Sequence, residues 1–570
     1  GEVVLDVSID GAPKEAQVFF APADAATKDA VAAQYLSTYA TCAPLLGPVS
    51  GASPACNRVL TRGPTKVLVP PGKYLLRATA GIAASLAEAT IDVAGGASIT
   101  VPLALATLDL MPPGTLSADF HVHGGRSFDS AIPDLTRIHA FLASGLDVVA
   151  ATDHDVVTRY TDALGVGGRL IIMTGIETTG NVLHEFVPDE TLPKVIGHWN
   201  FWPMAFTPAS PYRGGAWDEL MEPGTLFATM RQHGLSPNGV IQLNHPFTAS
   251  SFGRDLGYPQ AIGFTTEGGI PTRDDGSAQA LISRVPPQGG DSNLAYDTQE
   301  VMNGTDNLQL QAYRAYWHFL LDSGVVRAAT ANSDSHGLTD AVVGTPRTIV
   351  FTRLPFDEST FQADVKAGRM IGTNGPIILA SLKDTTGATR APSIQAIKPA
   401  PNATLDVVVR APPWAPVAEV RIIVDGKVAR TITDVSHGTD PLATRALEVW
   451  RGSIALAELL PADGLDHWIS VEAGSPLPAT ADLNCDGIPD TTDNNRDGVI
   501  DERDAEDFDP LAPGIECDYE YGPVMSPPPP ADPFDPLARF DAVTPGGFPF
   551  AFTNPLLIDA DGNGFEGAAK

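Results

Sequence analysis

One repeated pattern constrains the fold of this chain more than any other feature. Between residues 115 and 385, short apolar runs end in a histidine or an acidic residue, and stretches with helical periodicity, such as residues 132–145, lie between them. This alternation predicts parallel strands joined by helices. The carboxyl ends of parallel strands meet at one edge, so the polar residues there predict a functional site at the rim of a barrel or open sheet.

The polar residues at the strand ends are typical metal ligands. Six of the 12 histidines in the chain end an apolar run in this segment. His121 and His123 lie two positions apart, so their rings share one face of a strand, and Asp334 and His336 repeat that spacing. Imidazole nitrogen and carboxylate oxygen are the donors that divalent transition metals prefer. The candidate donors are His121, His123, Asp129, Asp153, His154, Glu177, His198, His245, Asp334 and His336.

Eight motifs of this segment, in the same order along the chain, resemble those of the polymerase-and-histidinol-phosphatase (PHP) superfamily of metal-dependent hydrolases, and in particular its carbaryl-hydrolase-like branch. The motifs are DFHVH, SFDS, ATDHD, TGIETT, GHWNFWP, NHPF, EVMNG and NSDSH. The resemblance covers residues 115–385. It implies a distorted (β/α)7 barrel with a cluster of up to three metal ions at the rim formed by the strand C-termini.

The same resemblance assigns the metal ligands. It places His121, His123, Glu177 and Asp334 on a first ion, Glu177 with His198 and His245 on a second ion, and Asp129, His154 and His336 on a third. The spacing from His123 to Asp129 is one residue longer than in the superfamily at large, so the count stays at two or three ions, of Zn, Mn or Fe. His184 is the alternative to His198 as a ligand. Asp153 is expected to orient a ligand, as carboxylates behind metal-bound side chains do.

Other polar residues of this segment are expected to have structural roles. Glu300 and Asn303, in the EVMNG motif, are expected to support a strand end. His139, His233 and His318 lie on stretches with helical character. They are expected to be ordinary surface or core residues.

A metal cluster of this kind predicts a hydrolase. Adjacent divalent ions lower the pKa of a shared water to about 7, so a metal-bridging hydroxide is the expected nucleophile. Three divalent ions outweigh three carboxylates and one hydroxide by about two positive charges. That balance favours a phosphate ester as the small-molecule substrate.

Two other functions stay open. A carboxylic or carbamic aryl ester fits the same cluster if Asn200 and Trp202, on one strand face with His198, line the substrate pocket; Trp199 and Phe201 then belong to the core. The second alternative is a non-catalytic surface binding or adhesion protein that carries calcium-binding loops. Metal analysis and a panel of esters separate these functions.

The chain of 570 residues is too long for one core, so several domains are expected. Residues 1–112 read as a β-sandwich that resembles carboxypeptidase-regulatory-like or transthyretin-like domains, and residues 113–388 form the hydrolase barrel. Residues 389–480 read as a second β-sandwich, residues 481–517 as calcium-binding loops, and residues 518–570 as a Pro-rich linker with a tail that returns to the second sandwich. The expected fold class is therefore multidomain α/β plus all-β.

Two acidic repeats between residues 482 and 504 match the twelve-residue calcium loop with its central glycine. They resemble tandem thrombospondin-type-3 or dockerin-like repeats. The predicted Ca²⁺ ligands are Asp482, Asn484, Asp486, Ile488, Asp490, Asp493, Asn495, Asp497, Val499, Asp501 and Asp504. A shorter motif near the end offers Asp559, Asp561 and Asn563. A solvated acidic segment is the alternative in each case.

Cysteines and charge bear on the compartment and the partners. The simplest pairing of the four cysteines joins Cys42 to Cys56 and Cys485 to Cys517. Such disulfides predict a secreted, periplasmic or cell-surface protein, and a chain that begins at Gly1 fits a processed N-terminus. A net charge of -32 argues against a nucleic acid partner, and no apolar run is long enough for a transmembrane segment. The oligomeric state stays open.

Overall fold

The computed structural model describes most of the chain. The described residues are 1–35, 58–160, 169–180, 194–246, 255–261, 285–287, 289–305, 307–338, 342–476 and 532–568. All four cysteines, His184 and residues 482–504 lie outside this set, so the predicted disulfides, the alternative ligand and the tandem calcium loops stay predictions. No helix in the described part of the chain is long and apolar enough to cross a membrane.

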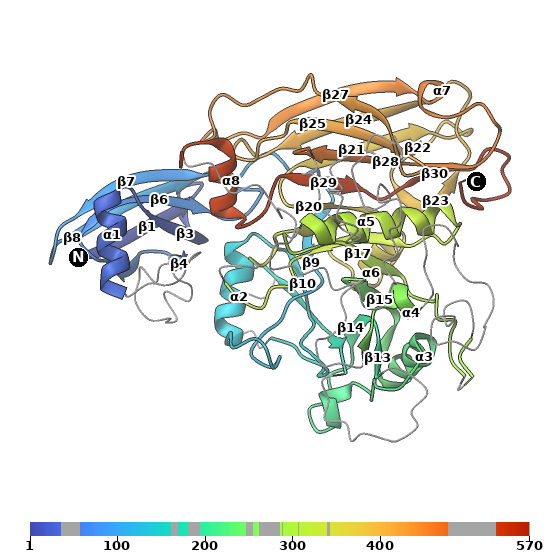
Figure 1. Cartoon of the computed structure of the whole chain (residues 1–570), viewed down its shortest axis with the longest axis horizontal. Helices are drawn as coiled ribbons and strands as arrows, with labels where there is room; N and C mark the ends of the chain where they lie inside the picture. Colours follow the sequence, from blue (N-terminus) through green and yellow to red (C-terminus); the bar gives the residue numbers. More distant parts are fainter. Residues whose placement is uncertain are drawn as a thin grey trace, which may run out of the picture.

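The N-terminal part is a sandwich of two four-stranded sheets, drawn in blue in Figure 1. In one sheet β1 pairs with β2, β5 and β8, and the other sheet has the order β4-β3-β6-β7. Along β1, Val3, Leu5, Val7 and Ile9 alternate toward the interior and are all buried, as a strand with one face on a core requires. The elements are β1 Glu2–Ile9, β2 Ala12–Pro13, β3 Glu15–Pro22, α1 Ala25–Tyr35, β4 Arg58–Arg62, β5 Thr65–Leu68, β6 Gly72–Thr79, β7 Ala87–Val93 and β8 Ser98–Leu105.

The central part is α/β and holds the strand ends that the sequence singles out. Its first half comprises β9 Thr115–Asp119, α2 Asp134–Ala143, β10 Val148–Ala151, β11 Ile171–Thr174, β12 Ile176–Thr178, β13 Val195–Ile196, β14 His198–Met204, the 3-10 helix Pro211–Gly214 and α3 Pro223–His233. Its second half comprises β15 Leu235–Asn244, β16 Asp255–Leu256, α4 Tyr258–Ala261, β17 Thr298–Asn303, α5 Asn307–Asp322, β18 Ala328–Asn332, β19 Arg347–Phe351, α6 Glu358–Lys366 and β20 Met370–Thr373.

Two central sheets share one interior. One contains the order β11-β10-β9-β19-β20, and the other has the order β12-β14-β15-β17-β18. Ala118 and Val148 from the first sheet pack with Trp202, Val240 and Ala328 from the second in a single buried cluster. In the described residues the two sheets do not join into one closed hydrogen-bonded ladder, so the seven-stranded barrel stays an expectation.

The parallel arrangement predicted from the sequence holds for only part of these sheets. β9, β10 and β11 are parallel, as are β15, β17 and β18. β14, however, runs antiparallel to β12 and β15. The register pairs Met204 with Leu235, so the connection containing α3 leaves and re-enters the sheet at the same end instead of crossing it. Helical periodicity between two strands does not distinguish these two routes.

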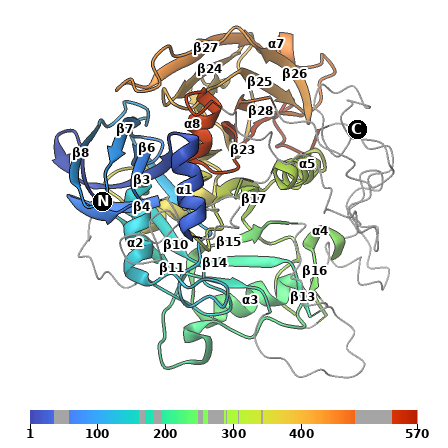
Figure 2. The same cartoon turned by 60° about the vertical axis from the view of Figure 1, so that its left-hand side comes forward.

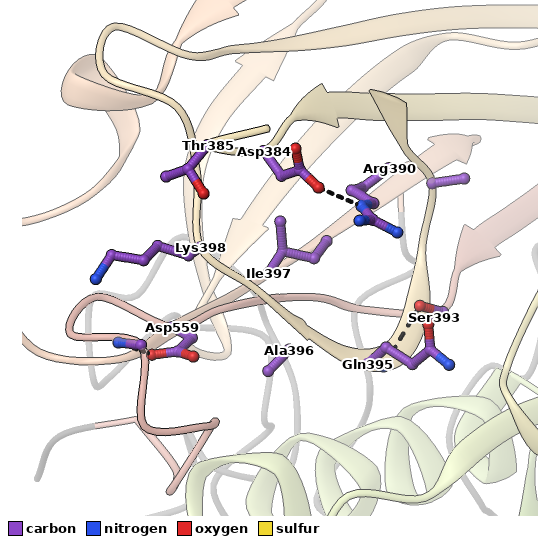
Figure 3. Close-up of a pocket in the computed structure, with 11 residues that line it drawn as sticks. Asp384, Thr385, Arg390, Ser393, Gln395, Ala396, Ile397, Lys398 and Asp559 are labelled. Carbon is purple, nitrogen blue, oxygen red and sulfur yellow. Dashed lines mark hydrogen bonds and ion pairs between the residues drawn. The ribbon is translucent and has the colours of Figure 1, made fainter. Parts of the chain in front are cut away.

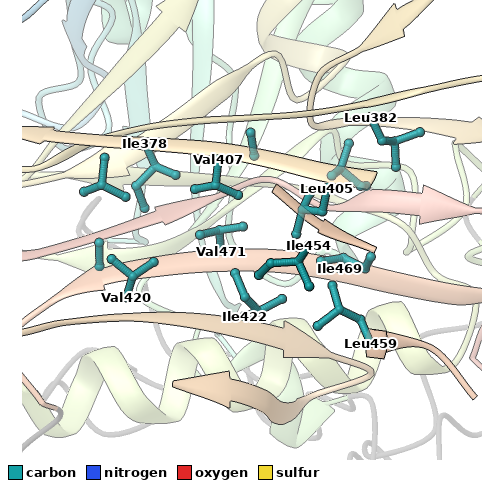
Figure 4. Packing of buried hydrophobic residues seen from close by; sticks show 14 of the residues in the cluster. Ile378, Leu382, Leu405, Val407, Val420, Ile422, Ile454, Leu459, Ile469 and Val471 are labelled. Atoms are coloured by element: carbon teal, nitrogen blue, oxygen red, sulfur yellow. The ribbon is translucent and has the colours of Figure 1, made fainter. Parts of the chain in front are cut away.

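The second sandwich follows the central part and packs a large aliphatic core (Figure 4). One sheet has the order β22-β21-β24-β27, and Leu405 and Val407 of β24 face Ile422 and Val471 of the other sheet in this core. The elements are β21 Ile377–Lys383, β22 Thr389–Arg390, β23 Ser393–Ile397, β24 Thr404–Ala411, β25 Glu419–Val424, β26 Lys427–Ile432, β27 Leu447–Ala455, α7 Leu456–Leu459, β28 His467–Gly474, α8 Pro536–Val543, β29 Phe550–Thr553 and β30 Leu556–Ile558.

The C-terminal tail joins the second sandwich to the central part. β30 pairs with β28 and β23, and β29 lies between β28 and β20 (Figure 1). Through β29 the two parts share one sheet of eleven strands. The tail also contacts the N-terminal sandwich, where Arg539 of α8 pairs with Glu88 at 3.0 Å.

Candidate metal centre

The donor residues lie at the ends of strands from both central sheets. His121 and His123 follow β9, and an isolated parallel bridge between Val122 and Ser335 places the loop after β18 beside them. A second isolated bridge joins His154, after β10, to Glu177 in β12. Backbone pairing therefore brings segments that are far apart in the sequence to one rim.

Glu177 occupies the centre of the cluster and is fully buried. Its Oε2 atom lies 3.3 Å from Nε2 of His121, 3.4 Å from Nε2 of His123 and 3.0 Å from Nδ1 of His154. Its Oε1 atom lies 3.3 Å from Nε2 of His245 and 3.7 Å from Nδ1 of His198. The two oxygens thus face two different sets of imidazoles, as a carboxylate that bridges two cations must.

Asp334 and Asp129 extend the cluster toward solvent. Oδ1 of Asp334 lies 3.1 Å from Nε2 of His121 and 3.0 Å from Nε2 of His123. Oδ2 of Asp129 lies 3.0 Å from Nε2 of His154 and 3.1 Å from Nε2 of His336. The side chains of Asp129 and His336 are about one third exposed, whereas His121, His123 and Glu177 are buried. Solvent therefore reaches the cluster from the Asp129 side.

Donor atoms close enough to share an ion fall into four overlapping groups. The groups are His121, His123 and Glu177; His121, His245 and Asp334; Glu177, His198 and His245; and His123, Asp129, His154 and His336. All nine residues that the resemblance assigns as ligands are in these groups. Asp153 is not among them. The groups differ from the assignment in two respects. His123 also belongs to the outer group, which is the set with Asp129, His154 and His336, and His245 joins His121 and Asp334 as well as Glu177 and His198.

The hydrogen bonding of the donor atoms gives separate support for binding of divalent cations. Eight of the nine side chains carry a buried nitrogen or oxygen that makes no hydrogen bond within the described residues. These atoms are Nε2 of His121, His123, His198 and His336, Nδ1 of His154 and His245, Oε2 of Glu177 and Oδ1 of Asp334. Six of these atoms lie 3.0–3.4 Å from a histidine or carboxylate atom of the same cluster without forming a hydrogen bond. Buried polar atoms are rarely left without hydrogen bonds, and together these atoms make a nitrogen and oxygen donor set of the kind that zinc, manganese or iron binds.

The electrostatics of the cluster keep two carboxylates and two of the six imidazoles in the forms that bind metal. Burial, with the neighbouring imidazoles, lowers the pKa of His123 and of His198 to about 3, so both rings stay neutral. Burial alone would lower the pKa of the other four rings, but the neighbouring carboxylates raise it; these rings are His121, His154, His245 and His336. Burial alone would raise the pKa of Glu177 and of Asp334, but the surrounding histidines, His121 first, hold both pKa values well below the usual range. Neutral imidazole and ionised carboxylate are the ligand forms of these groups.

The backbone at two donors is strained. Asp334 has φ +49° and His245 has φ +22°, a region that residues with a side chain rarely adopt. Such conformations persist where the surrounding structure holds them, and they concentrate at functional sites. Here they turn two donor side chains into the cluster immediately after their strands end.

Several buried residues orient the donors, and sequence reasoning found only part of this role. Oε1 of Glu300 lies 2.9 Å from Nδ1 of His121, so Glu300, expected only to support a strand end, holds a ligand ring. The Ser127 hydroxyl lies 2.9 Å from Nδ1 of His123. Asp153, expected to orient a ligand, accepts a hydrogen bond from the backbone N–H of Gly124, the residue after His123, at 2.6 Å. An acidic residue within a strand, as in EVMNG, is the sequence signal that marks Glu300.

Asn200 and Trp202, the two residues proposed for the substrate pocket, lie in the core of the domain and not at the rim. His198, Asn200 and Trp202 share the inward face of β14, but that face runs into the core. Trp202 is fully buried and stacks on Phe120 with ring centroids 4.6 Å apart, and Asn200 donates a hydrogen bond to the Phe120 carbonyl at 2.9 Å. A substrate that enters at the rim does not meet Trp202, because β14 is buried on both faces.

The remaining histidines and the acidic tail lie apart from this cluster. His139 is half-buried, His233 is exposed at the end of α3, and His318 is buried in α5 against Trp468. In the tail, carboxylates of three residues approach one another: Asp466, Asp559 and Asp561. The backbone N–H of Asn563 donates a hydrogen bond to Asp561, and those of Gly562 and Gly564 donate to Asp559. Calcium binding in the tail stays a prediction.

A separate cavity of about 340 Å³ lies between β21–β23 and the tail (Figure 3). Arg390 and Asp384 pair with each other on one side of it at 2.6 Å, and Lys398 and Asp559 line the opposite side. None of the nine donors borders this cavity, so it is distinct from the metal centre.

Fold and site together define an α/β domain whose strand ends gather a polynuclear set of histidine and carboxylate donors. A scan against protein-family models and a search of curated proteins both find no match to the chain. Among solved structures, the chain is similar to a two-domain protein from Bacteroides vulgatus described as containing a predicted PHP-like metal-dependent phosphoesterase. The TM-score is 0.32 at 15% sequence identity, over 65% of this chain and 94% of that chain. A likeness this weak carries no argument for fold or function.

Proposed function

We propose that the chain is a metal-dependent hydrolase that cleaves a phosphate ester. The observation that carries the proposal is the clustering of nine donors, five of which contact Glu177, with eight buried donor atoms left without hydrogen bonds. Zinc, manganese or iron, as two or three ions, fits this donor chemistry. The PHP superfamily, suggested by the eight motifs, is part of the same proposal.

The chain supplies positioning and charge, and the ions supply the nucleophile. When bound, adjacent divalent ions lower the pKa of a shared water so that hydroxide is available at neutral pH. Glu177 and Asp334 both contact His121 and His123 and so hold these two rings in a fixed geometry, and Glu300 keeps the His121 ring in place from behind. Asp129 and His336 are the donors on the solvent side, so the ester approaches past them. An excess of positive charge in the loaded site favours a phosphate group over a neutral one.

An aryl ester of a carboxylic or carbamic acid is the second candidate. One observation favours it: Phe128, next to Asp129, is 62% exposed, and its ring centroid lies 5.0 Å from that of His154. A large apolar ring held beside the exposed donors offers a surface on which an aromatic group can pack. In this second candidate function, Phe128 replaces Trp202 as the residue that packs against the aryl group.

A panel of esters tests the proposal. Protein stripped of metal and reconstituted separately with zinc, manganese or iron is assayed on phosphate, carboxylic and carbamic esters that share one aryl leaving group. Phosphate turnover that depends on added metal and falls more than about 100-fold in Glu177→Gln is expected, because the variant removes the bridging charge. Faster cleavage of the carboxylic or carbamic ester supports the second candidate. Loaded protein without turnover supports the alternative of a non-catalytic binding protein.

The compartment is part of the proposal as well. A secreted, periplasmic or cell-surface location rests on the paired spacing of the four cysteines and on the acidic repeats, which Ca²⁺ outside the cell would occupy. A thiol titration of the unfolded chain tests it: no reactive thiol is expected, and four free thiols contradict it.

A further inference from the structure

Arg137 lies in α2, one turn from the helix N-terminus, and is fully buried. Within the described residues it forms no ion pair with a carboxylate at contact distance, unlike the buried Arg314, which meets Glu472 at 2.5 Å. Placing a cation in a protein interior is costly unless its N–H groups are satisfied. Arg137 must therefore be held by neutral acceptors.

The acceptors belong to two donor-bearing loops. The Nε atom of Arg137 donates to the His123 carbonyl at 2.8 Å, and one terminal nitrogen donates to both the His123 carbonyl and the Ser335 carbonyl. The other terminal nitrogen donates to the Ser335 hydroxyl at 3.0 Å and the Gly337 carbonyl at 3.5 Å. All five N–H groups of the guanidinium have an acceptor in this arrangement.

These contacts fix the distance between the loop after β9 and the loop after β18. Ser335 lies between the donors Asp334 and His336, and the backbone N–H of His123 donates to the same Ser335 carbonyl at 3.0 Å. The rings of His123 and His336 stack with centroids 3.9 Å apart. A shift of either loop would separate His123 from His336. These two residues belong, with Asp129 and His154, to the outer group of donors.

α2 is itself held in place from its other side. It packs against β3 and β4 of the N-terminal sandwich, and Figure 2 shows it between that sandwich and the central strands. Nε2 of His139, on the same helix, lies 3.0 Å from the Thr61 carbonyl of β4. The guanidinium therefore extends from a supported helix to the backbone of both loops.

We propose that Arg137 is a positioning residue for the outer metal ion: it acts through the backbone of His123 and Ser335 to set the spacing of the outer donors. The proposal rests on one part of the proposed function, which is that the cluster binds metal ions. Lysine does not replace arginine here, because one ammonium group lacks the planar fork that reaches both carbonyls.

Metal titration without any substrate tests the proposal. Stripped wild-type protein, Arg137→Lys and Arg137→Met are titrated with cobalt(II), with the visible absorption and the ions bound per chain as readouts. The last ion to bind is expected to bind about 10- to 100-fold more weakly in both variants, as when other residues behind metal ligands are lost. The ions held by Glu177, His198 and His245 are expected to keep their affinity and their spectrum, because Arg137 does not touch those segments.

Arg347→Lys is the matched control, since Arg347 is also fully buried and donates to backbone carbonyls, those of Gly344 and Ser144. It is expected to lower stability but not the affinity for the outer ion. Unchanged affinity for that ion in Arg137→Lys overturns the proposal, and so does an equal weakening of every ion. If wild-type protein binds all its ions but hydrolyses no ester, the proposed function is wrong and the proposed role of Arg137 stands. Wild-type protein that binds no ion overturns both.

Discussion

Glu300 holds the ring of His121 from behind, with Oε1 of Glu300 2.9 Å from Nδ1 of His121. The opposite nitrogen of that ring faces Glu177 and Asp334. Oε2 of Glu300 accepts a hydrogen bond from the backbone N–H of His245 at 2.7 Å, so one carboxylate supports two donors.

Glu300→Gln is expected to weaken metal binding about 10-fold or more, because the neutral amide no longer increases the basicity of the His121 ring. Metal titration of the stripped variant measures this. Glu222→Gln is the control: Glu222 is an equally buried acid of the same domain and accepts a hydrogen bond from Asn293 at 2.9 Å. Equal metal affinity in wild type and Glu300→Gln contradicts the role given to Glu300.

Phe128→Ala is expected to reduce the preference for aromatic esters. Packing of two aromatic rings contributes about 1 kcal/mol, so the ratio of kcat/KM for phenyl phosphate to that for methyl phosphate should fall about 5-fold or more. Leu354→Ala, which removes a side chain 56% exposed outside the site, should leave the ratio unchanged. A ratio that is the same in Phe128→Ala and wild type shows that the ring does not contact the substrate.

Trp202→Ala is expected to act on stability. The indole is fully buried in the interior shared by the two central sheets, and truncation of such a side chain costs about 3–5 kcal/mol of unfolding free energy. Urea unfolding measures the loss, and Trp202→Phe should recover most of it. If Trp202→Ala has wild-type stability but a raised KM for aryl esters, Trp202 instead belongs to the substrate pocket.

The second sandwich is expected to show a pH-dependent stability. Burial alone would lower the pKa of His467, but hydrogen bonds to Asp425 and Asp463, at 2.6 Å and 3.1 Å, raise it above 6.5. A raised pKa means that the folded state binds the proton more tightly. The protonated His467 ring therefore contributes its full stabilisation of the folded state below a pH of about 6.5. This stabilisation is lost as the pH rises through the raised pKa.

His467→Gln should accordingly lower Tm more at about pH 5.5 than at about pH 9. Thermal unfolding at the two pH values checks this, with His437→Gln, at an exposed position of the same sandwich, as the control. A loss of the same size at both pH values contradicts the role of the protonated ring.

The sequence anticipates the convergence of the donors because two simple periodicities determine it. Residues two apart on a strand share a face, and parallel strands end at one edge, so these periodicities predict that His121, His123 and Asp334 lie together. The depth of a residue along a strand is not encoded in this way. At about 3.3 Å per residue, Trp202 lies roughly 13 Å along β14 from His198, far enough to leave the rim for the core.

Long-range contacts set the remaining features. The insertion of β29 between β20 and β28 depends on strands that are distant in sequence, and four residues of β-forming character do not reveal their partners. Arg137 lies within a helical pattern, where an arginine is ordinarily read as a surface residue. Only the positions of the His123 and Ser335 carbonyls explain why it is buried.

The most direct measurement is anomalous X-ray diffraction from crystals of the protein reconstituted with zinc or manganese. Two or three anomalous peaks, with neighbours roughly 3.5–4 Å apart, are expected among Glu177, His123 and Asp334, with Glu177 between two of them. Anomalous peaks that lie elsewhere, with none beside Glu177, would contradict the proposed metal centre. Donor side chains that point away from one another in the metal-loaded crystal would contradict it as well.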